Sequence, residues 1–104
     1  MNFEEYKNCG LRRSLTILSG KWKPFILHNL LEEDQVRFVE LWRNMPRVSK
    51  KVLAEQLKQL EDDFIIERIE VYNFPPEVYY KLTEKGRKLG PILSELHSWG
   101  NDLG

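Results

Sequence analysis

The sequence predicts an α+β fold that is mostly helical, a winged helix-turn-helix with extra helices at both ends of the chain. Three observations between residues 37 and 82 carry this prediction. Two apolar stripes with helical spacing follow one another, a sharp turn separates them, and the hydrophobic period then changes from about 3.6 to about 2. We expect residues 1–104 to form a single domain, because a chain of this length builds one hydrophobic core.

The first two predicted helices are defined by their stripes and by the residues at their ends. The first stripe ends before Pro46, because the residue before a proline is pushed away from helical geometry. Ser49 then offers an N-cap for the second helix. The first stripe comprises Phe38, Leu41, Trp42 and Met45, and the second comprises Leu53, Leu57, Leu60 and Phe64.

A hairpin is predicted directly after the second helix. Ile69 and Val71 alternate with charged residues on the first strand, and the segment 74–76, Phe-Pro-Pro, makes the bend. The return strand alternates through Val78, Tyr80 and Leu82. We interpret Tyr72, Tyr79 and Tyr80 mainly as packing residues of this hairpin, although one of them could touch a DNA backbone. Two short helices followed by a hairpin are typical of a winged helix-turn-helix, a motif that reads DNA.

Two further helices are expected before this motif. The first carries a stripe that Gly20 ends, and the second should start near Lys21, because Pro24 is tolerated only in a first helical turn. The stripe before Gly20 is Leu11, Leu15 and Leu18, and the stripe after it is Trp22, Phe25, Ile26 and Leu30.

A last helix, capped by Thr83, is expected after the hairpin. Its apolar residues repeat at spacings of 3, 4, 3 and 4, as in a coiled-coil seam, and Gly90-Pro91 predicts a kink or a break. The seam is Leu89, Ile92, Leu96, Trp99 and Leu103. Such a seam either folds back onto its own core or packs on the same helix of a second copy. We favour a homodimer, in which Leu11 and Leu15 assist the seam.

The charge is balanced overall but unevenly distributed along the chain. The 16 basic and 16 acidic residues give no net charge, which is unusual for a DNA-binding protein. Residues 36–60, however, hold six basic and two acidic residues, whereas residues 61–80 hold one basic and six acidic residues. The basic segment coincides with the helix pair that would face DNA. Ordinary solvated surfaces are the alternative interpretation.

Several functional classes find no support in the residues. The chain offers no nucleophile–base–acid set and no glycine-rich phosphate loop, so we expect no enzyme and no cofactor. His28 and His97 lie far apart in the sequence without other ligands at metal-binding spacing, so no metal site is expected. The sequence has no apolar stretch long enough for a membrane span and no secretory signal at residues 1–7. With a single cysteine, Cys9, we expect a cytoplasmic, nucleoid-associated protein.

The motifs along almost the whole chain resemble the HxlR-type winged helix-turn-helix transcriptional regulators, which are related to the MarR regulators. The resemblance implies a homodimer built from the terminal helices, a recognition helix that begins at Ser49 and enters a major groove, and a wing around residues 73–77 placed against the DNA backbone or minor groove. It rests on Cys9, Gly20-Lys21-Trp22, Arg37-Phe38, Glu40-Leu41, Ser49-Lys50-Lys51-Val52-Leu53, Gln56-Leu57, Leu60-Glu61, Pro75-Pro76, Val78, Tyr80, Leu82-Thr83-Glu84-Lys85-Gly86, Leu89, Pro91 and Trp99-Gly100.

Three residues depart from the family pattern. Phe64 stands where a glycine usually ends the recognition helix, so we expect that the helix exit cannot use left-handed glycine geometry. Arg47 replaces a glycine in the turn between the two helices and could reach a phosphate. Glu77 stands where the wing often carries a basic residue, and an acid there would repel phosphates.

The predicted DNA contacts follow from the helical wheel of the second helix and from the resemblance. Lys51 could donate to guanine N7 and O6, and Ala54 could approach a thymine methyl group. Ser49 is expected to act as a cap and phosphate contact, Lys58 as a phosphate contact or a solvated side chain, and Arg37 as a phosphate clamp or a partner of Glu40. The full set is Arg37, Arg47, Ser49, Lys50, Lys51, Ala54, Lys58, Asn73, Pro75 and Pro76.

The predicted function is therefore a homodimeric transcriptional regulator that binds double-stranded DNA at a pseudo-palindromic operator. A winged-helix module that binds another protein without reading DNA is the alternative. Some members of the family use a cysteine at the position of Cys9 as a thiol sensor, and Arg12 and Arg13 nearby would favour the reactive thiolate. The alternatives are that Cys9 is a small buried residue at the dimer surface, or that a small molecule is the effector.

Overall fold

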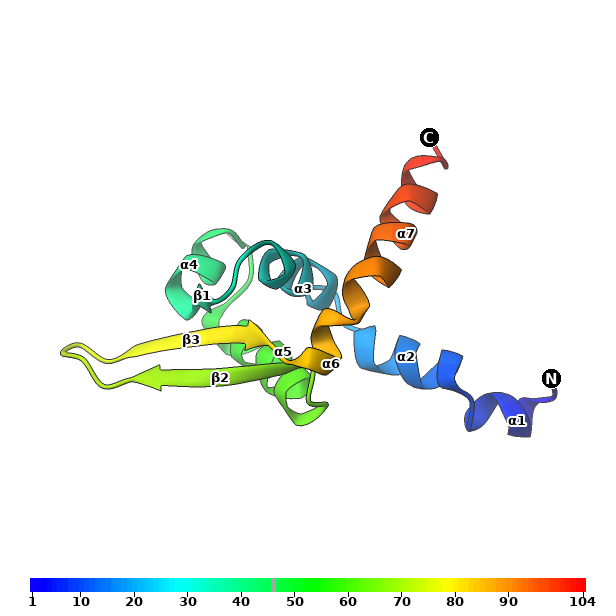
Figure 1. Cartoon of the computed structure of the whole chain (residues 1–104), viewed down its shortest axis with the longest axis horizontal. Helices are drawn as coiled ribbons and strands as arrows, with labels where there is room; N and C mark the ends of the chain where they lie inside the picture. The colour runs from blue at the N-terminus through cyan, green and yellow to red at the C-terminus, as the bar shows by residue number, and fades with distance from the viewer. Residues whose placement is uncertain (46) are drawn as a thin grey trace.

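The computed structural model describes residues 1–45 and 47–104, so Pro46, which we expect to end a helix, lies outside the described residues. The fold is the predicted winged helix-turn-helix with helices at both ends (Figure 1). Its elements are α1 (Phe3–Lys7), α2 (Gly10–Leu18), α3 (Lys23–Glu32), β1 (Val36–Arg37), α4 (Phe38–Arg43), α5 (Lys50–Asp62), β2 (Ile66–Val71), β3 (Glu77–Leu82), α6 (Glu84–Arg87) and α7 (Leu89–Asn101).

The hydrophobic core lies between α3, α4, α5 and the inner face of the sheet. Three leucines at helical spacing on α5 are fully buried, as their stripe predicts, and Met45 is buried at the end of the α4 stripe. Burying one such side chain contributes about 1.5–3 kcal/mol. The fully buried members of the core include Ile26, Leu27, Leu30, Leu41, Leu53, Leu57 and Leu60.

The wing is a three-stranded antiparallel sheet in the order β1-β3-β2. The two-residue strand β1 is not predicted by the sequence, because a segment this short shows no period. Register pairs Ile66 with Leu82 and Arg68 with Tyr80, so these four side chains share the inner face. Ile69 lies opposite Tyr79 on the outer face. Arg68 and Glu70 of β2 therefore point toward the helices, whereas its half-buried apolar residues, Ile69 and Val71, point outward.

The end of the recognition helix α5 differs from the prediction. Phe64 does not belong to the buried stripe: the helix ends at Asp62, and the Phe64 side chain is 72% exposed. Phe64 has φ 61°, which is the left-handed geometry that we expected only glycine to provide. The amide of Ile65 donates to Leu60 O and that of Phe64 to Glu61 O, both at 3.0 Å, so the end is a Schellman motif. Burial of Leu60 and Ile65 beside this turn accounts for its formation despite the unfavourable residue.

Replacing Phe64 with glycine should therefore stabilise the protein. A left-handed conformation costs a non-glycine residue about 1–2 kcal/mol. Glycine avoids this cost, but its greater flexibility in the unfolded chain lowers the net gain in stability by about half. We expect Phe64→Gly to raise the free energy of unfolding by about 0.5–1 kcal/mol, measured by urea denaturation at fixed protein concentration. Phe64→Ala is the control, because it removes the ring but keeps the strained φ and should give no gain. A less stable glycine variant would show that the ring contributes to the fold.

The N-terminal helices also differ in detail from the prediction. The short helix α1 is not expected from the sequence, and α3 starts at Lys23 rather than near Lys21. The buried side of α3 is centred on Leu27, so Phe25, predicted to lie in the stripe, is 39% exposed. Gly20, at φ 140°, ends the α2 segment as predicted, and a Cβ there would clash with Gln56 Oε1.

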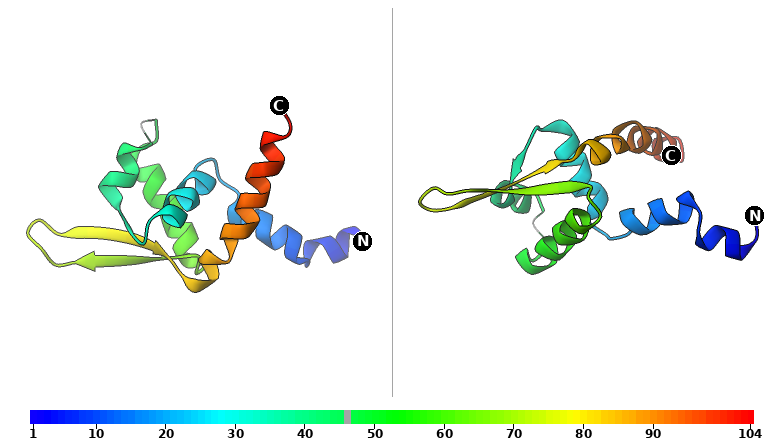
Figure 2. Two further views of the ribbon diagram at one scale, coloured as in Figure 1. Left: turned by 45° about the horizontal axis from the view of Figure 1, so that its top comes forward. Right: turned by 60° about the horizontal axis from the view of Figure 1, so that its bottom comes forward.

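The C-terminal segment breaks earlier than predicted. Thr83 caps α6 by accepting from the Gly86 amide at 3.0 Å, and α6 ends at Arg87. The break falls at Lys88, and Gly90-Pro91 lies inside the first turn of α7. The proline has no amide hydrogen to donate to the carbonyl of Arg87, four residues earlier, so the helix cannot run through from α6. Helix α7 then leaves the body of the molecule at an angle (Figure 2).

Candidate nucleic-acid interface

The N-terminal turn of α5 presents the residues predicted to contact DNA. Ser49 caps the helix, since its Oγ accepts from the Val52 amide at 3.1 Å. Lys50, Lys51 and Ala54 are all exposed on this helix. The ammonium of Lys50 lies 4.8 Å from the centre of the Trp42 ring, whereas no ion pair involves Lys51 within the described residues. Lys51 is thus the cation on this turn that is available to a base edge.

The turn that positions α5 is held by a side-chain hydrogen bond from α4. Trp42 Nε1 donates to Val48 O at 3.0 Å, one residue before the Ser49 cap. Val48 itself is buried, and Arg47 is exposed on the outside of the turn. The start of the helix is therefore fixed to the core. A helix that enters a groove at a defined angle needs such a fixed start.

Two predicted phosphate contacts have partners of their own. Lys58 Nζ lies 3.0 Å from Asp62 Oδ1, and this hydrogen bond raises the pKa of the lysine above its usual value. Arg37 lies in β1 rather than in a helix, and among the described residues it forms no ion pair with Glu40, which corrects that alternative. Its charge instead acts on Glu77, across the sheet. Lys58 therefore keeps its charge at the surface.

The wing carries little free positive charge. The two long strands, β2 and β3, hold two basic residues, and both are paired: Arg68 with Glu70, and Lys81 with Glu67 at 3.3 Å. Glu77 accepts a hydrogen bond from the Tyr79 hydroxyl at 2.7 Å. That bond, followed by the nearby Arg37 charge, lowers the pKa of Glu77, so this carboxylate stays ionised.

The wing tip consists of exposed uncharged residues. Asn73, Pro75 and Pro76, predicted as DNA contacts, are all exposed there. Tyr72 is 90% exposed and Phe74 is fully exposed, so the prediction that Tyr72 packs in the hairpin is wrong, whereas Tyr80 is buried as predicted. Residue 72 lies beyond the end of β2, where no neighbouring strand reaches it.

A cleft of about 420 Å³ joins the wing to the recognition helix. It brings four predicted contacts together, Arg37 from β1, Ala54 and Lys58 from α5, and Pro76 from the wing. Arg68 also lines it, and sequence reasoning missed this residue. The alternation of the strand could have indicated it, because residue 68 lies two positions after Ile66 and therefore on the same, inner face.

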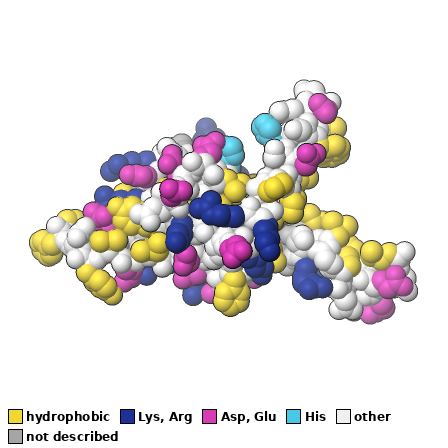
Figure 3. Space-filling model, in the orientation of Figure 1, with side chains coloured by type: hydrophobic (Ala, Val, Ile, Leu, Met, Phe, Trp, Pro, Cys, Tyr) yellow, Lys and Arg dark blue, Asp and Glu magenta, His cyan; other side chains and the backbone are white. Residues whose placement is uncertain are grey.

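A second exposed surface is apolar and lies on the terminal helices. Helix α7 does not fold back onto the core: Figure 3 shows hydrophobic side chains along α7 and α2, on the sides that face each other. Leu89 is the exception, since it packs with Leu93 against its own core. The exposed members of the predicted dimer set are Leu11, Leu15, Ile92, Leu96, Trp99 and Leu103, each at least 51% exposed.

The space between α2, α3 and α7 is a groove of about 880 Å³ with mainly apolar walls. Phe25 and Leu31 line it from α3, and Leu96 from α7. His28 and His97, far apart in the sequence, both line it, and each has a partner: Glu32 at 3.0 Å and Asn101 at 3.1 Å. Within the described residues, no group of three His, Cys, Asp or Glu side chains could hold a metal ion, and no helix is long and apolar enough to cross a membrane.

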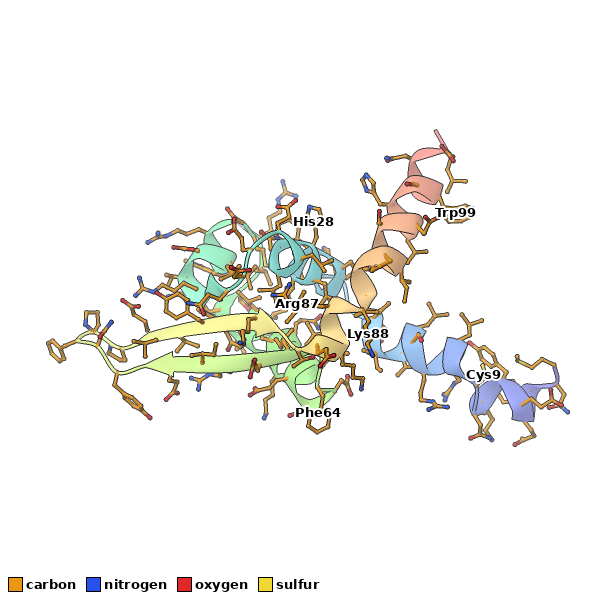
Figure 4. The ribbon with its side chains drawn as sticks, in the orientation of Figure 1. Cys9, His28, Phe64, Arg87, Lys88 and Trp99 are labelled. Carbon is orange, nitrogen blue, oxygen red and sulfur yellow. The ribbon has the colours of Figure 1, made fainter. Side chains whose placement is uncertain are left out.

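Cys9 lies at the junction of α1 and α2, on the N-terminal arm (Figure 4). It is half-buried, and its side chain makes no capping hydrogen bond. Arg12 donates to Lys7 O at 3.4 Å and Arg13 to Asn8 O at 3.2 Å, so both guanidinium groups are held at the carbonyls just before the cysteine.

The recognition helix and the wing on a compact helical core define a DNA-binding transcriptional regulator of the winged helix-turn-helix class, and comparison with known proteins supports this class. The chain belongs to the HxlR-like helix-turn-helix family, whose model matches residues 17–104.

Proteins similar to this chain are named transcriptional regulators, and the chain covers most of their length. An uncharacterized HTH-type transcriptional regulator of Halalkalibacterium halodurans is 44% identical over 87 residues, which is 84% of this chain and 77% of that protein. The HTH-type transcriptional regulator YodB of Bacillus subtilis is 35% identical over 93 residues, 89% of this chain and 82% of YodB. The solved structure of the redox regulator HypR in its reduced form has a TM-score of 0.85 at 34% identity and covers 90% of this chain and 92% of HypR.

Proposed function

We propose that the regulator acts as a homodimer on a pseudo-palindromic operator, with the two α5 helices in successive major grooves. The observation that carries this proposal is the exposed, capped start of α5, where Lys51 and Ala54 face away from three fully buried leucines. Lys51 and Ala54 would contact base edges, because they lie on the first turns of the helix. The remaining predicted contacts would position the protein on phosphates and the minor groove: Arg37, Arg47, Ser49, Lys50, Lys58, Asn73, Pro75 and Pro76.

The proposed dimer rests on the apolar side chains that α2 and α7 leave in water. Leu96 and Trp99 are 51% and 65% exposed on a helix that projects from the body, and Leu15 from α2 faces the same groove. An apolar surface of this kind marks an interaction site, and a two-fold axis through it would set two recognition helices side by side.

Selection from random duplex DNA by the full chain tests the proposal. The recovered sequences should form a pseudo-palindrome with half-sites about 10 base pairs apart, because two related helices must meet successive major grooves. Affinity should fall steeply with salt, since the basic residues displace counterions from phosphates.

A protein-interaction module is the competing function. The balanced net charge and the internal pairing of the β2 and β3 cations, Arg68 and Lys81, favour it. Failure of the chain to retain any duplex at low salt would support this alternative and contradict the operator proposal.

We further propose that Cys9 makes the regulator responsive to oxidation. Half-burial leaves the thiol reachable, and Arg12 and Arg13 hold two cations at the carbonyls just before it. HypR, a structural relative, is named a redox regulator. With a single cysteine per chain, oxidation would have to join two subunits or form a mixed disulfide with an added thiol.

Diamide, which oxidises two thiols to a disulfide, should therefore change operator affinity, and Cys9→Ser should abolish the change while reduced-state binding stays intact. Operator titration before and after treatment measures both effects, and a non-reducing gel identifies the disulfide. If iodoacetamide does not label Cys9 in the folded protein, the packing interpretation holds, and the response must then come from a small-molecule ligand or from the protein level.

A further inference from the structure

The tip of the wing has a composition that electrostatic DNA contacts do not explain. Residues 72–76 are Tyr, Asn, Phe, Pro and Pro, without a charge, and the basic residues of β2 and β3, Arg68 and Lys81, are paired with acids. A wing that clamps phosphates needs free cations. Any contact that this tip makes is therefore made by apolar and amide groups.

Two aromatic side chains at the tip contribute little to the fold. Phe74 is fully exposed and Tyr72 is 90% exposed, in contrast to Tyr80, which is buried further down the hairpin. Aromatic rings left in water gain stability only when something covers them. Full exposure at the end of a hairpin thus indicates a binding role.

The backbone of the tip holds these side chains in a defined position. The Asn73 amide donates to Val71 O at 2.9 Å, which forms a tight turn where β2 ends. Pro75 and Pro76 fix two φ angles directly after Phe74. A rigid tip loses little conformational entropy when it enters a partner, so Phe74 is presented ready to insert.

The position of the tip selects DNA as its partner. The hairpin ends at the side of the molecule opposite both termini, so a second copy that covers α2 and α7 leaves the tip free (Figures 1 and 2). Pro76, at the base of the tip, lines the same cleft as Ala54 and Lys58 of the recognition helix. The tip therefore continues the surface that faces DNA, and it reaches beyond the major groove that α5 would occupy.

We propose that Phe74 is an apolar wedge that enters the minor groove beside each half-site and partly unstacks a base step, with Asn73 hydrogen-bonding to base edges next to it. Proteins that insert apolar side chains in this way kink the duplex, and the cost of unstacking depends on the sequence that is deformed. The wedge adds a preference for easily unstacked steps that flank the bases read by Lys51. This inference rests on the proposed operator binding.

The test uses the full chain and a DNA duplex that contains the operator recovered by selection. The two ends of the duplex carry a dye pair that reports bending of the DNA. Phe74→Ala should weaken binding about tenfold, abolish most of the bend and leave the salt slope unchanged, because no phosphate contact is lost. Phe74→Leu should keep most of the bend. Phe64→Ala is the matched control, since it removes another exposed phenylalanine, just beyond the C-terminal end of α5 (Figure 4), and should bind and bend DNA as the wild type does.

The contrary outcomes are distinct. If Phe74→Ala binds and bends the operator like the wild type, the wedge is wrong, and operator binding still stands as long as the wild type selects a palindrome. If that variant fails only in a purified transcription reaction with RNA polymerase, the tip contacts a protein rather than DNA. A reduced salt slope would show that the tip acts on phosphates, which also contradicts the wedge.

Discussion

Replacing Lys51 with alanine is expected to weaken operator binding by about 1–3 kcal/mol and to relax the base preference at one symmetric pair of positions. Lys51 is exposed on the first turn of α5, and among the described residues it has no acidic partner that would hold its ammonium away from a base. A lysine that donates to guanine N7 and O6 discriminates against the other bases at that position. Titration of a panel of operators, each changed at one symmetric pair, measures the loss.

Lys58→Ala is the matched control for this experiment. Lys58 lies two turns further along the same helix and is paired with Asp62 at 3.0 Å. Lys58→Ala should weaken binding to all sequences alike and flatten the salt dependence, because the lysine would contact a phosphate. If the wild type binds every sequence equally and the two variants behave alike, α5 does not read bases, and the protein is an interaction module or a non-specific DNA coat.

Replacing Leu96 with glutamate is expected to dissociate the proposed homodimer and to lower operator affinity about 10²–10⁴-fold, because each half-site must then be bound without its linked partner. The charge would be buried without a partner in the dimer interface, which is costly. Leu96 is 51% exposed in the single chain, so the variant should still fold, with unchanged helical circular dichroism. Sedimentation at micromolar concentration measures the mass.

Ser98→Glu serves as the control for the dimer experiment, since Ser98 is exposed on the same helix about half a turn away from the apolar seam. It should leave both the mass and the affinity unchanged. A wild-type chain that sediments as a stable monomer would contradict the dimer and, with it, the two-fold symmetry of the operator.

The local elements of this protein are determined by its sequence. Helical stripes of leucines predict α5 and its buried side, and Ser49 and Thr83 cap their helices as expected. The residues of the recognition helix that face away from the core follow from the same stripe. Periodicity and capping involve residues three or four positions apart, so the chain itself carries the information.

Only the tertiary structure decided which surfaces those elements share. Val36 pairs with Tyr80, a contact between distant residues, and this pairing creates β1 and the inner face on which Arg68 joins Ala54 and Lys58. The left-handed conformation of Phe64 likewise follows from packing that outweighs local preference. Strand pairing and burial depend on contacts between segments that are far apart in the sequence, whereas a periodic pattern reports only on the neighbours of each residue.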